Sequence, residues 1–505
     1  MKRSLIIIIV ILLATGLGML GAHGRWGDGK NQIRPPLVAG SFYPDDPAQL
    51  RAIVGELLAE TPPQTLSDPL FAIVAPHAGY VYSARIAARA YAQIKGKKYK
   101  RVVVIAPSHA EPFSFTSIYN GDAYATPLGP IPVDKNFAEK LAGKDSTLKL
   151  SEAGHGCAID RCEHAVEVHL PFLQESLGVD LKIVPVVMGR GDYDASRALG
   201  VALSELIQRD TETHEPDTLI VASSDLSHFH VYDEAVSLDQ KTLGAIEKND
   251  YLSLSENLDL GIWEACGGAP IIAAMMAAER MGATGRKILA YANSGDVTGD
   301  KSRVVGYGAM AFFQEKERED GKQMSFSLDE KDKKRLLTLA RESVETSVRG
   351  KRIPPLPDKL SKPLLTPFGA FVTLTENGRL RGCKGFITPN KSLAETVREV
   401  AMLSALSDTR FAPVEEEELN KLEYEISVLS PFRRVSDLKD IQIGRDGLLI
   451  RQGVRQGILL PQVATEHKMG VRQFVEETAM KAGLPPQAWQ DEDTDLFAFS
   501  AFVFE

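Results

Sequence analysis

Short apolar runs rich in valine and isoleucine recur through the first part of this chain, and helix-forming sequence follows them. Runs of this length and composition are typical of strands that are buried on both faces of a parallel sheet. The strand-like runs lie at residues 71–75, 102–106, 181–187, 219–222, 288–292 and 304–313, and helix-like stretches include 84–94 and 195–207. This alternation predicts an α/β fold, in which a parallel or mixed sheet is covered by helices on both faces.

Polar residues follow three of these runs at the point where each run stops. His77 follows the first run, His109 follows the second, and Asp225 and His228 follow the fourth. The carboxyl ends of parallel strands meet at one edge of a sheet, so we expect these side chains to converge there. A single histidine at a strand end is usually a hydrogen-bonding residue, whereas three such ends together favour a metal or catalytic site.

Cys266 comes just before a glycine pair, a proline and the apolar stretch 271–278. Because proline is tolerated in the first turn of a helix, we expect Cys266 near a helix N-terminus, where the helix dipole favours thiolate over thiol. Two imidazoles and a thiolate select zinc, iron or copper over magnesium and calcium. Asp225 and His228 are then expected as hydrogen-bond partners of the ligands or as a general base.

The composition of the chain is that of ordinary globular protein. Its 505 residues are 44% hydrophobic and 25% charged, which leaves room for two or three domains. The net charge of −9 provides no basic surface for nucleic acid, so we expect no nucleic-acid partner.

The first 30 residues carry a separate signal. Lys2 and Arg3 precede an apolar run that continues to Ala22, as in an export signal or a single membrane anchor. Leu20 stands where a cleavage site prefers a small residue, which favours an uncleaved anchor over a removed peptide. The two basic residues should stay in the cytoplasm and leave the bulk of the chain outside it. The alternative is a buried N-terminal helix.

Four cysteines are too few for a disulfide scaffold. In an oxidising compartment Cys157 and Cys162 can pair across the short loop between them. The flanking His155 and His164 make a small metal clip the first alternative, and two free thiols are the second.

A strongly charged stretch divides the chain in two. We expect an N-terminal segment at 1–30, a first domain at 34–314, a charged linker at 315–328 and a second domain at 329–505. Within the second domain, residues 371–374 and 422–429 predict strands and residues 392–406 predict a helix. These signals favour a smaller α+β domain.

The first domain resembles the Memo family. The motifs that carry the resemblance are AGSFYP at 39–44, PHAGYVYS at 76–83, PSH at 107–109, EHAVEVHLP at 163–171, SSDLSH at 223–228 and CG at 266–267. That family is similar in fold to the extradiol dioxygenases of the nonhaem iron type. The resemblance implies metal binding at His77, His109 and Cys266. It also implies that Asp225 and His228 occupy the neighbouring positions of the acid–base residues. Iron is the implied metal, and copper is the alternative.

The resemblance implies an oxidative enzyme that acts on a small molecule, similar to the nonhaem-iron dioxygenases, with Tyr80 lining the crevice. Ring-cleaving relatives use two histidines and a carboxylate, but here Cys266 would replace the carboxylate. A thiolate is oxidisable and suits copper(I), so the rival hypothesis is a redox-protective protein that binds copper or iron without turnover. A third hypothesis is a scaffold that binds peptides or partner proteins.

The second domain resembles the AMMECR-type domain. The matching segments are LRGC at 380–383 followed by Gly385, SDTRFAP at 407–413, ISVLSP at 426–431 and LPQV at 460–463. Lys384 departs from the apolar residue that is usual there. Arg381 and Cys383 are candidates to bind an anion or to act as a nucleophile. The alternative is a structural cysteine beside an arginine that pairs with Asp408.

The second resemblance brings in RNA and a radical-SAM protein as candidate partners. RNA modification has been suggested for the family, although the acidic balance of this chain does not support it. Both domain types often accompany a radical-SAM protein, in the AmmeMemoRadiSam system, which implies such a partner. An exported chain would be separated from a partner that stays in the cytosol.

Overall fold

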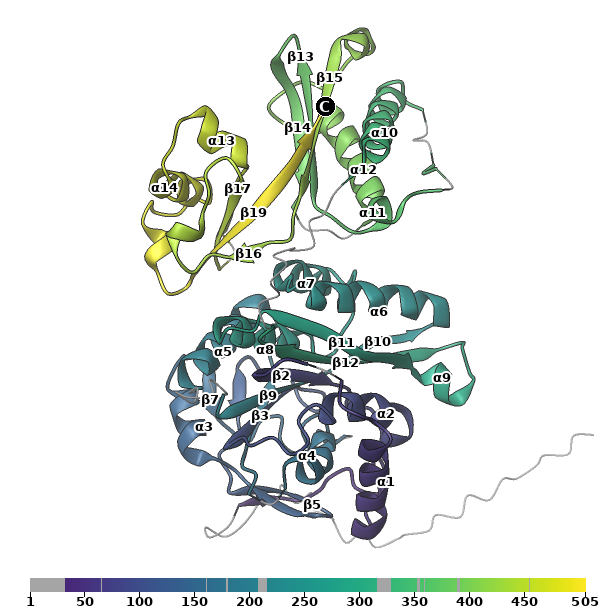
Figure 1. The fold of residues 1–505 in the computed structure, drawn as a ribbon, viewed down its shortest axis with the longest axis vertical. Coiled ribbons are helices and arrows are strands. Elements are labelled where there is room, and N and C mark those ends of the chain that lie inside the picture. The colour runs from purple at the N-terminus through teal and green to yellow at the C-terminus, as the bar shows by residue number, and fades with distance from the viewer. Residues whose placement is uncertain are drawn as a thin grey trace, which may run out of the picture.

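The computed structural model of the protein describes residues 32–505 except 65, 160, 179, 208–215, 316–327, 352–354, 358, 388–390 and 454. The chain forms two bodies, a larger one before the linker and a smaller one after it, which lie one above the other in Figure 1. The expected N-terminal segment and nearly all of the expected linker lie outside the described residues. Among the helices of the described part, none combines the length and the apolar character needed to cross a membrane.

A nine-stranded mixed sheet forms the centre of the larger body, in the order β10-β12-β2-β9-β3-β8-β4-β7 with β11 paired to β12. Its strands are β2 (Leu70–Ala75), β3 (Arg101–Pro107), β4 (Thr116–Ile118), β7 (Leu148–Leu150), β8 (Ile183–Met188), β9 (Thr218–Ser223), β10 (Asp225–His230), β11 (Gly285–Asn293) and β12 (Val304–Phe313). The central strands β2, β9, β3 and β8 are parallel, while β12 is antiparallel to β2, β10 and β11. The predicted mixed sheet is therefore confirmed.

Helices cover both faces of this sheet (Figure 1). One face carries α1 (Pro47–Ala59), α2 (Tyr80–Tyr91), η1 (Glu167–His169) and α4 (Leu170–Leu177), and the other carries α3 (Lys135–Ala142), α5 (Tyr193–Leu206), α6 (Tyr232–Glu247), α7 (Tyr251–Asp259) and α8 (Gly268–Arg280). In β3, Val103 and Ile105 pack into one core while Val102 and Val104 pack into the other. Because both faces are buried, the strands are apolar at nearly every position.

Smaller elements complete the larger body. The strands β1 (Ile33–Arg34), β5 (Ala123–Thr126) and β6 (Gly129–Pro132) form a separate three-stranded sheet, and the short helix α9 (Ser294–Thr298) joins β11 to β12.

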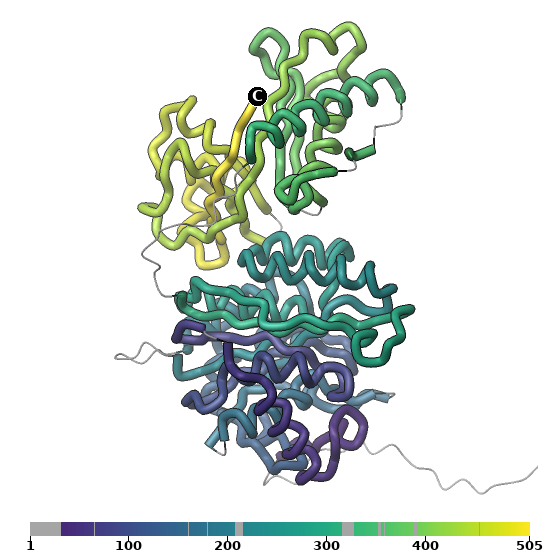
Figure 2. The backbone as a smooth tube through the Cα atoms, turned by 45° about the vertical axis from the view of Figure 1, so that its right-hand side comes forward, coloured from purple at the N-terminus to yellow at the C-terminus, as the bar shows by residue number. Residues whose placement is uncertain are grey.

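The smaller body is an antiparallel α+β domain, as the sequence predicts. Its seven strands are β13 (Ala370–Glu376), β14 (Arg379–Phe386), β15 (Leu422–Leu429), β16 (Arg433–Arg434), β17 (Asp446–Gln452), β18 (Arg455–Leu459) and β19 (Thr494–Phe504). Its helices are α10 (Glu330–Val348), α11 (Lys362–Leu365), α12 (Leu393–Leu406), η2 (Glu416–Lys421), η3 (Leu438–Asp440), α13 (Pro461–Glu466), α14 (Val471–Lys481) and η4 (Ala488–Gln490). The long strand β19 joins two cores, one under α10 and α12 and one under α14, which Figure 2 shows as two lobes.

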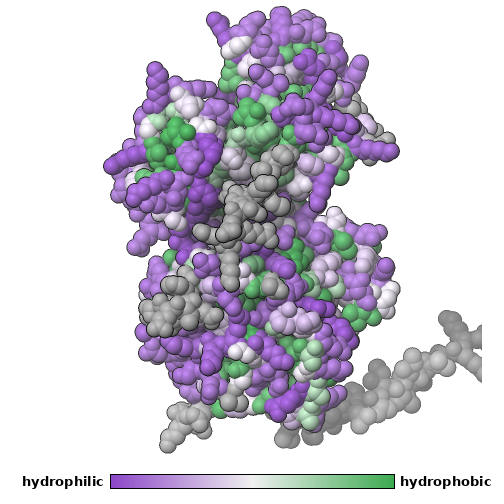
Figure 3. Space-filling model, viewed as in Figure 1, coloured by the Kyte–Doolittle hydropathy of each residue, from purple (hydrophilic) through white to green (hydrophobic). Residues whose placement is uncertain are grey.

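The two bodies pack directly against each other. The apolar core on the α8 face of the larger body continues into Leu429, Phe432 and Phe497 of the smaller body. Beside these side chains, the buried Asp495 accepts hydrogen bonds from two residues of α5, Tyr193 (3.0 Å) and Arg197 (2.7 Å). By contrast, hydrophilic residues cover most of the side of the two bodies that Figure 3 shows. The contact between the bodies is thus an apolar surface with an ion pair inside it.

Candidate metal centre

Three histidines lie together at one edge of the larger sheet. The candidate ligand atoms of His77, His109 and His164 all lie within 4.8 Å of one another. His77 follows β2 and His109 follows β3, and both strands are hydrogen-bonded to β9, so their carboxyl ends meet at the same edge. The rings of His77 and His109 are 5.0 Å apart between centroids. The structure thus brings together the two histidines that the strand ends singled out.

The ring of His77 is held in one tautomer. Its Nδ1 lies 2.7 Å from the hydroxyl of Ser223, and that hydroxyl donates to the carbonyl of Ala165 at 2.7 Å. A serine hydroxyl has a single proton, so Ser223 must accept a hydrogen bond from Nδ1–H of His77. The lone pair of His77 is therefore on Nε2, the nitrogen that a metal would use.

Glu163 orients His109 in the same way. One carboxylate oxygen lies 3.2 Å from Nδ1 of His109, and the backbone N–H of His109 donates to the other oxygen at 2.5 Å. Burial alone would raise the pKa of Glu163, but hydrogen bonds from the side chain and backbone of His109 and from the backbone of Ala165 lower it to about 2. The ionised carboxylate accepts from Nδ1–H, which leaves Nε2 of His109 free.

His164 is a member of the cluster that the strand-end pattern did not single out. Its ring stacks on His109 at 4.9 Å between centroids, and the centroid of the Phe42 ring lies 4.4 Å from that of His164. Burial lowers the pKa of His164 to about 4, so the ring is neutral at pH 7. The available signal was the EHAVEVHLP motif at 163–171, which begins at Glu163 and His164, although we expected His164 as a ligand only in a small metal clip with the neighbouring cysteines.

Cys266 lies beside His77, with its Sγ 3.2 Å from Nε2. It precedes Gly267, the N-cap of α8, as expected. A Cβ on Gly267 would lie 2.0 Å from the carbonyl oxygen of Ser223, so glycine is needed for the helix start to approach the end of β9. Burial raises the pKa of the Cys266 thiol and outweighs the helix dipole. The prediction of a thiolate is therefore wrong for the metal-free protein.

Asp225 and His228 lie at the start of β10, next to the cluster. Asp225 accepts a hydrogen bond from the backbone N–H of His77 at 2.9 Å, and burial raises its pKa to about 7. Burial also lowers the pKa of His228, whose backbone N–H donates to Glu264 at 3.1 Å. The pairing of β10 with β12 shifts register on both sides of His228, and the following Phe229 has a φ of +64°. Such irregularities re-aim side chains and are common beside functional sites.

Tyr80, expected to line the crevice, begins α2 close to His77. Its hydroxyl donates to the carbonyl of Val168 at 2.8 Å, and its ring packs against Tyr43 and Phe172. Burial raises the pKa of Tyr80 well above its ordinary value. In this arrangement the hydroxyl joins α2 to η1.

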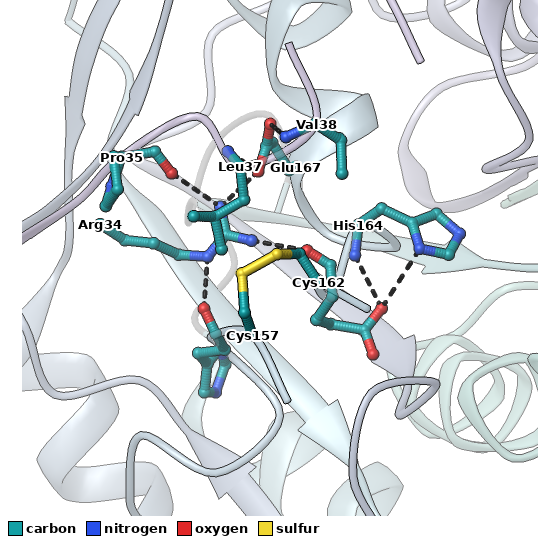
Figure 4. The surroundings of a disulfide bond; sticks show 10 residues. Arg34, Pro35, Leu37, Val38, Cys157, Cys162, His164 and Glu167 are labelled. Atoms are coloured by element: carbon teal, nitrogen blue, oxygen red, sulfur yellow. Dashed lines mark hydrogen bonds and ion pairs between the residues drawn. A yellow bond between two sulfur atoms is a disulfide. The ribbon is translucent and has the colours of Figure 1, made fainter. Parts of the chain in front are cut away.

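A disulfide joins Cys157 and Cys162 beside the cluster. Figure 4 shows the bridge between Arg34 on one side and His164 on the other. The carboxylate of Glu163, the residue after Cys162, accepts the backbone N–H of His164 at 2.9 Å. This pairing excludes the free thiols and the small metal clip that the sequence left open.

Arg34 contacts the loop that carries Glu163 and His164, and it lies across the disulfide from His164 (Figure 4). Its guanidinium pairs with the buried Glu167 at 2.5 Å and donates to the carbonyl of Glu163 at 2.6 Å. Glu167 also accepts the backbone N–H groups of Leu37 (2.9 Å) and Val38 (3.0 Å). A buried ion pair and a disulfide together position the loop that carries Glu163 and His164.

The other two candidates, Arg381 and Cys383, lie on β14 in the smaller body. Arg381 forms a bidentate pair with Glu418 at 2.6 and 2.9 Å, so the alternative pairing with Asp408 is wrong. The partner of Asp408 is Arg410, at 2.6 Å. Asp408 also accepts the backbone N–H of Cys383 at 2.9 Å, and the half-buried thiol accepts from the hydroxyl of Thr373.

Comparisons with known proteins agree with this two-body architecture. Residues 34–311 match the family described as Memo-like protein, and residues 337–504 match the AMMECR1 family. A MEMO1 family protein of Methanopyrus kandleri is 35% identical over 287 residues, which are 55% of this chain and 98% of that protein. A MEMO1 family protein of Aquifex aeolicus is 34% identical over 286 residues, which are 56% of this chain and 99% of that protein.

Two solved structures are also similar. An uncharacterized protein from Pyrococcus horikoshii is 40% identical and aligns with 33% of this chain and 88% of its own, with a TM-score of 0.32. An uncharacterized protein from Escherichia coli K12 is 11% identical and aligns with 48% of this chain and 99% of its own, with a TM-score of 0.32. Because the Memo match spans more than half of the chain and nearly the full length of its relatives, the chain belongs to the Memo family and carries a C-terminal AMMECR1 domain.

Proposed function

We propose that the larger body is a metal-dependent enzyme that performs oxidative chemistry on a small molecule. The observation that carries the proposal is the cluster of His77, His109 and His164 at the carboxyl edge of parallel strands. Ligand crevices of open α/β sheets lie at this edge. Resemblance of the family fold to nonhaem-iron dioxygenases supports the oxidative assignment.

The donor set fits a transition metal. Burial and the neighbouring histidines lower the pKa of His77, and burial lowers the pKa of His164, so both rings are neutral at pH 7. Ser223 and Glu163 present the bare Nε2 atoms of His77 and His109. Imidazole nitrogen and cysteine sulfur favour iron or copper over magnesium and calcium, and we propose iron with copper as the alternative. A bound iron ion would supply Lewis-acid and redox chemistry at this point.

Two neighbouring groups can manage protons. The pKa of Asp225 is raised by burial to about 7, so its carboxyl can take up or release a proton near neutral pH. The pKa of His228 is lowered by burial, so its imidazole is neutral and can accept a proton. We propose Asp225 as the acid–base group and His228 as a second proton acceptor in the crevice.

Elemental analysis of anaerobically purified protein tests the metal site. We expect stoichiometric iron or copper in the wild type, and loss of most of it in His109→Ala and in Cys266→Ala. His467→Ala is the matched control, because His467 is exposed in the smaller body. Metal-free protein that also fails to take up either ion would overturn the metal site.

Oxygen consumption tests the chemistry separately. The iron-loaded wild type is incubated in air with a panel of catechols in an oxygen electrode, and products are identified by mass spectrometry. We expect oxygen uptake with ring-cleaved product, which Asp225→Asn reduces without loss of iron. Full iron occupancy with no uptake on any catechol would overturn the oxidative assignment while leaving the metal site intact.

One contact favours a second candidate function, which is metal binding without turnover. The Sγ of Cys266 lies 3.2 Å from Nε2 of His77, so a thiol and an imidazole can share one ion, and copper(I) favours sulfur ligands. Tight copper(I) binding that Cys266→Ala abolishes, with no oxygen consumption, would favour a redox-protective protein over an enzyme.

We also propose that the protein is exported or membrane-anchored, with its bulk outside the cytoplasm. The disulfide between Cys157 and Cys162 supports this location, because such bonds persist in oxidising compartments. The basic and apolar N-terminal sequence supports it as well. Fractionation of the native host, followed by immunoblotting, tests the location. Protein found entirely in the cytosolic fraction would contradict it.

A further inference from the structure

A cavity of about 430 Å³ lies between the two bodies, away from the histidine cluster. One wall comes from α6 and Trp263 of the larger body. The other comes from α11, the segment that leads into β13, and the turn between β15 and β16. Small-molecule sites typically have volumes of roughly 300–1,000 Å³ and often lie at domain interfaces. The cavity therefore has the size and the location of a ligand site.

The walls are largely apolar and include three aromatic side chains. Trp263 and Phe432 are buried and belong to the core that continues across both bodies, so this part of the wall is rigid. Phe368 lines the cavity from the smaller body, as Phe432 does, whereas Trp263 belongs to the larger body. Leu365, which also lines the cavity, is 56% exposed. An aromatic ring that entered the cavity would cover apolar surface that water now contacts.

The polar part of the lining carries a surplus of positive charge. Lys241, Lys248 and Lys362 line the cavity, and within the described residues none of the three forms an ion pair with a carboxylate. The ammonium of Lys248 lies 5.3 Å from the ring centroid of Phe368, which directs it toward the cavity wall. Lys362 is on the opposite body, so cations approach the cavity from both sides.

Acidic groups near the cavity do not cancel this charge. Asp250 is part of the lining, but its carboxyl accepts the backbone N–H (3.0 Å) and the hydroxyl (2.6 Å) of Ser253 as the cap of α7. Burial also raises its pKa. The negative charges of Asp250 and Glu247 act on Lys248, and Lys241 acts on Glu395, but these groups form no ion pair with one another in the described part of the chain.

We propose that this interdomain cavity binds a small organic anion with an aromatic body. The ring packs against the apolar wall, and the carboxylate faces Lys248 and Lys362. Since each body contributes part of the site, bound ligand stabilises the contact between the two domains. This site is distinct from the proposed metal centre, so it extends the function proposed above and does not depend on it.

Isothermal titration calorimetry of the full chain tests the proposal. The probe is 2-naphthoate, and 2-naphthalenemethanol is the neutral compound of the same shape. We expect one saturable site per chain that binds the acid roughly tenfold more tightly than the alcohol, because charge-assisted hydrogen bonds are the stronger ones. Equal affinities for the two compounds, or no saturable binding of 2-naphthoate at millimolar concentration, would overturn the proposal.

Two variants locate the binding. The double variant Lys248→Gln, Lys362→Gln should weaken 2-naphthoate at least tenfold and leave the alcohol unchanged, with the exposed Lys439→Gln as control. Gly244→Leu should abolish binding of both compounds, because Gly244 lines the cavity and an added Cβ meets no atom within 4 Å. Leucine also favours the helix over glycine, so α6 should stay folded. Unchanged affinity in Gly244→Leu would place the binding elsewhere and refute this site.

Discussion

The hydroxyl of Ser223 lies 2.7 Å from Nδ1 of His77 and donates its only proton to the carbonyl of Ala165. One buried hydroxyl thus sets the tautomer of a ring whose other nitrogen faces Cys266. Partners of this kind keep the lone pair of a histidine on the nitrogen that faces a metal.

Ser223→Ala should therefore weaken metal binding roughly 10- to 100-fold, because the ring of His77 loses the acceptor that fixes its tautomer. Competition with a chromophoric chelator measures the dissociation constant. Ser227→Ala is the control, since Ser227 is as deeply buried as Ser223 but lies in β10 and forms no hydrogen bond with the ring of His77 within the described structure. Equal affinities for the two variants would show that the hydroxyl does not orient the ring.

The buried carboxyl of Asp225 should make the stability of the metal-free protein depend on pH. Its pKa is about 7 in the folded protein and roughly 3.9 in an unfolded chain. Between these values the folded state holds a proton that the unfolded state has released. The free energy of unfolding should fall as the pH rises, by up to about 1.4 kcal/mol for each pH unit.

Asp225→Asn should lack this dependence, because the amide remains neutral at every pH. Denaturant unfolding of both proteins at intervals from pH 4.5 to 8 should show the variant gaining on the wild type up to about pH 7 and then a constant difference. A difference in the free energy of unfolding between the two proteins that stays constant across this whole pH range would contradict the raised pKa of Asp225.

The double variant Cys157→Ser, Cys162→Ser should lower the free energy of unfolding by about 2 kcal/mol, as expected for a short closed loop. It should also weaken metal binding, because Glu163 follows Cys162 directly and holds His109. Denaturant unfolding and chelator competition measure the two effects. Wild type treated with dithiothreitol should show the same loss of stability and of metal affinity. Unchanged metal affinity in either sample would show that the disulfide does not position the metal site.

Asp495→Ala should weaken the contact between the two bodies. Its carboxylate accepts hydrogen bonds from Tyr193, Arg197 and Arg280, and removing it leaves two half-buried guanidinium groups without this counter-charge. Loss of one partner of a buried ion pair typically costs about 3–5 kcal/mol. Scanning calorimetry should show a lower first transition and separate unfolding of the bodies, while Asp493→Ala should retain the wild-type profile.

The strands of the larger sheet were the most predictable part of the fold. The run at 304–313 coincides with β12, and the runs at 71–75 and 102–106 lie inside β2 and β3. Long apolar runs mark strands that are covered on both faces, which is a local signal. The three-residue strands β4 and β7 have no such run, because pairing with a neighbour, rather than composition, defines a strand that short.

Some residues of the candidate site were also predictable from local sequence, and others were not. His77, His109 and Asp225 were predictable because each follows a recognisable strand of a parallel sheet. His164 lies in a loop whose position depends on the Cys157–Cys162 disulfide and on the distant Arg34. No local pattern encodes a contact between segments so far apart in the chain.

The amino-acid sequence by itself determined the alternation of elements, the family motifs and the sheet edge at which the strand-end residues meet, because these depend on short-range apolar patterning. Only the tertiary structure decided that burial raises the pKa of the Cys266 thiol, that the two bodies share a core, and that a lysine-lined cavity lies between them. These properties depend on burial, and burial at any point is the sum of contacts from segments that are remote in sequence.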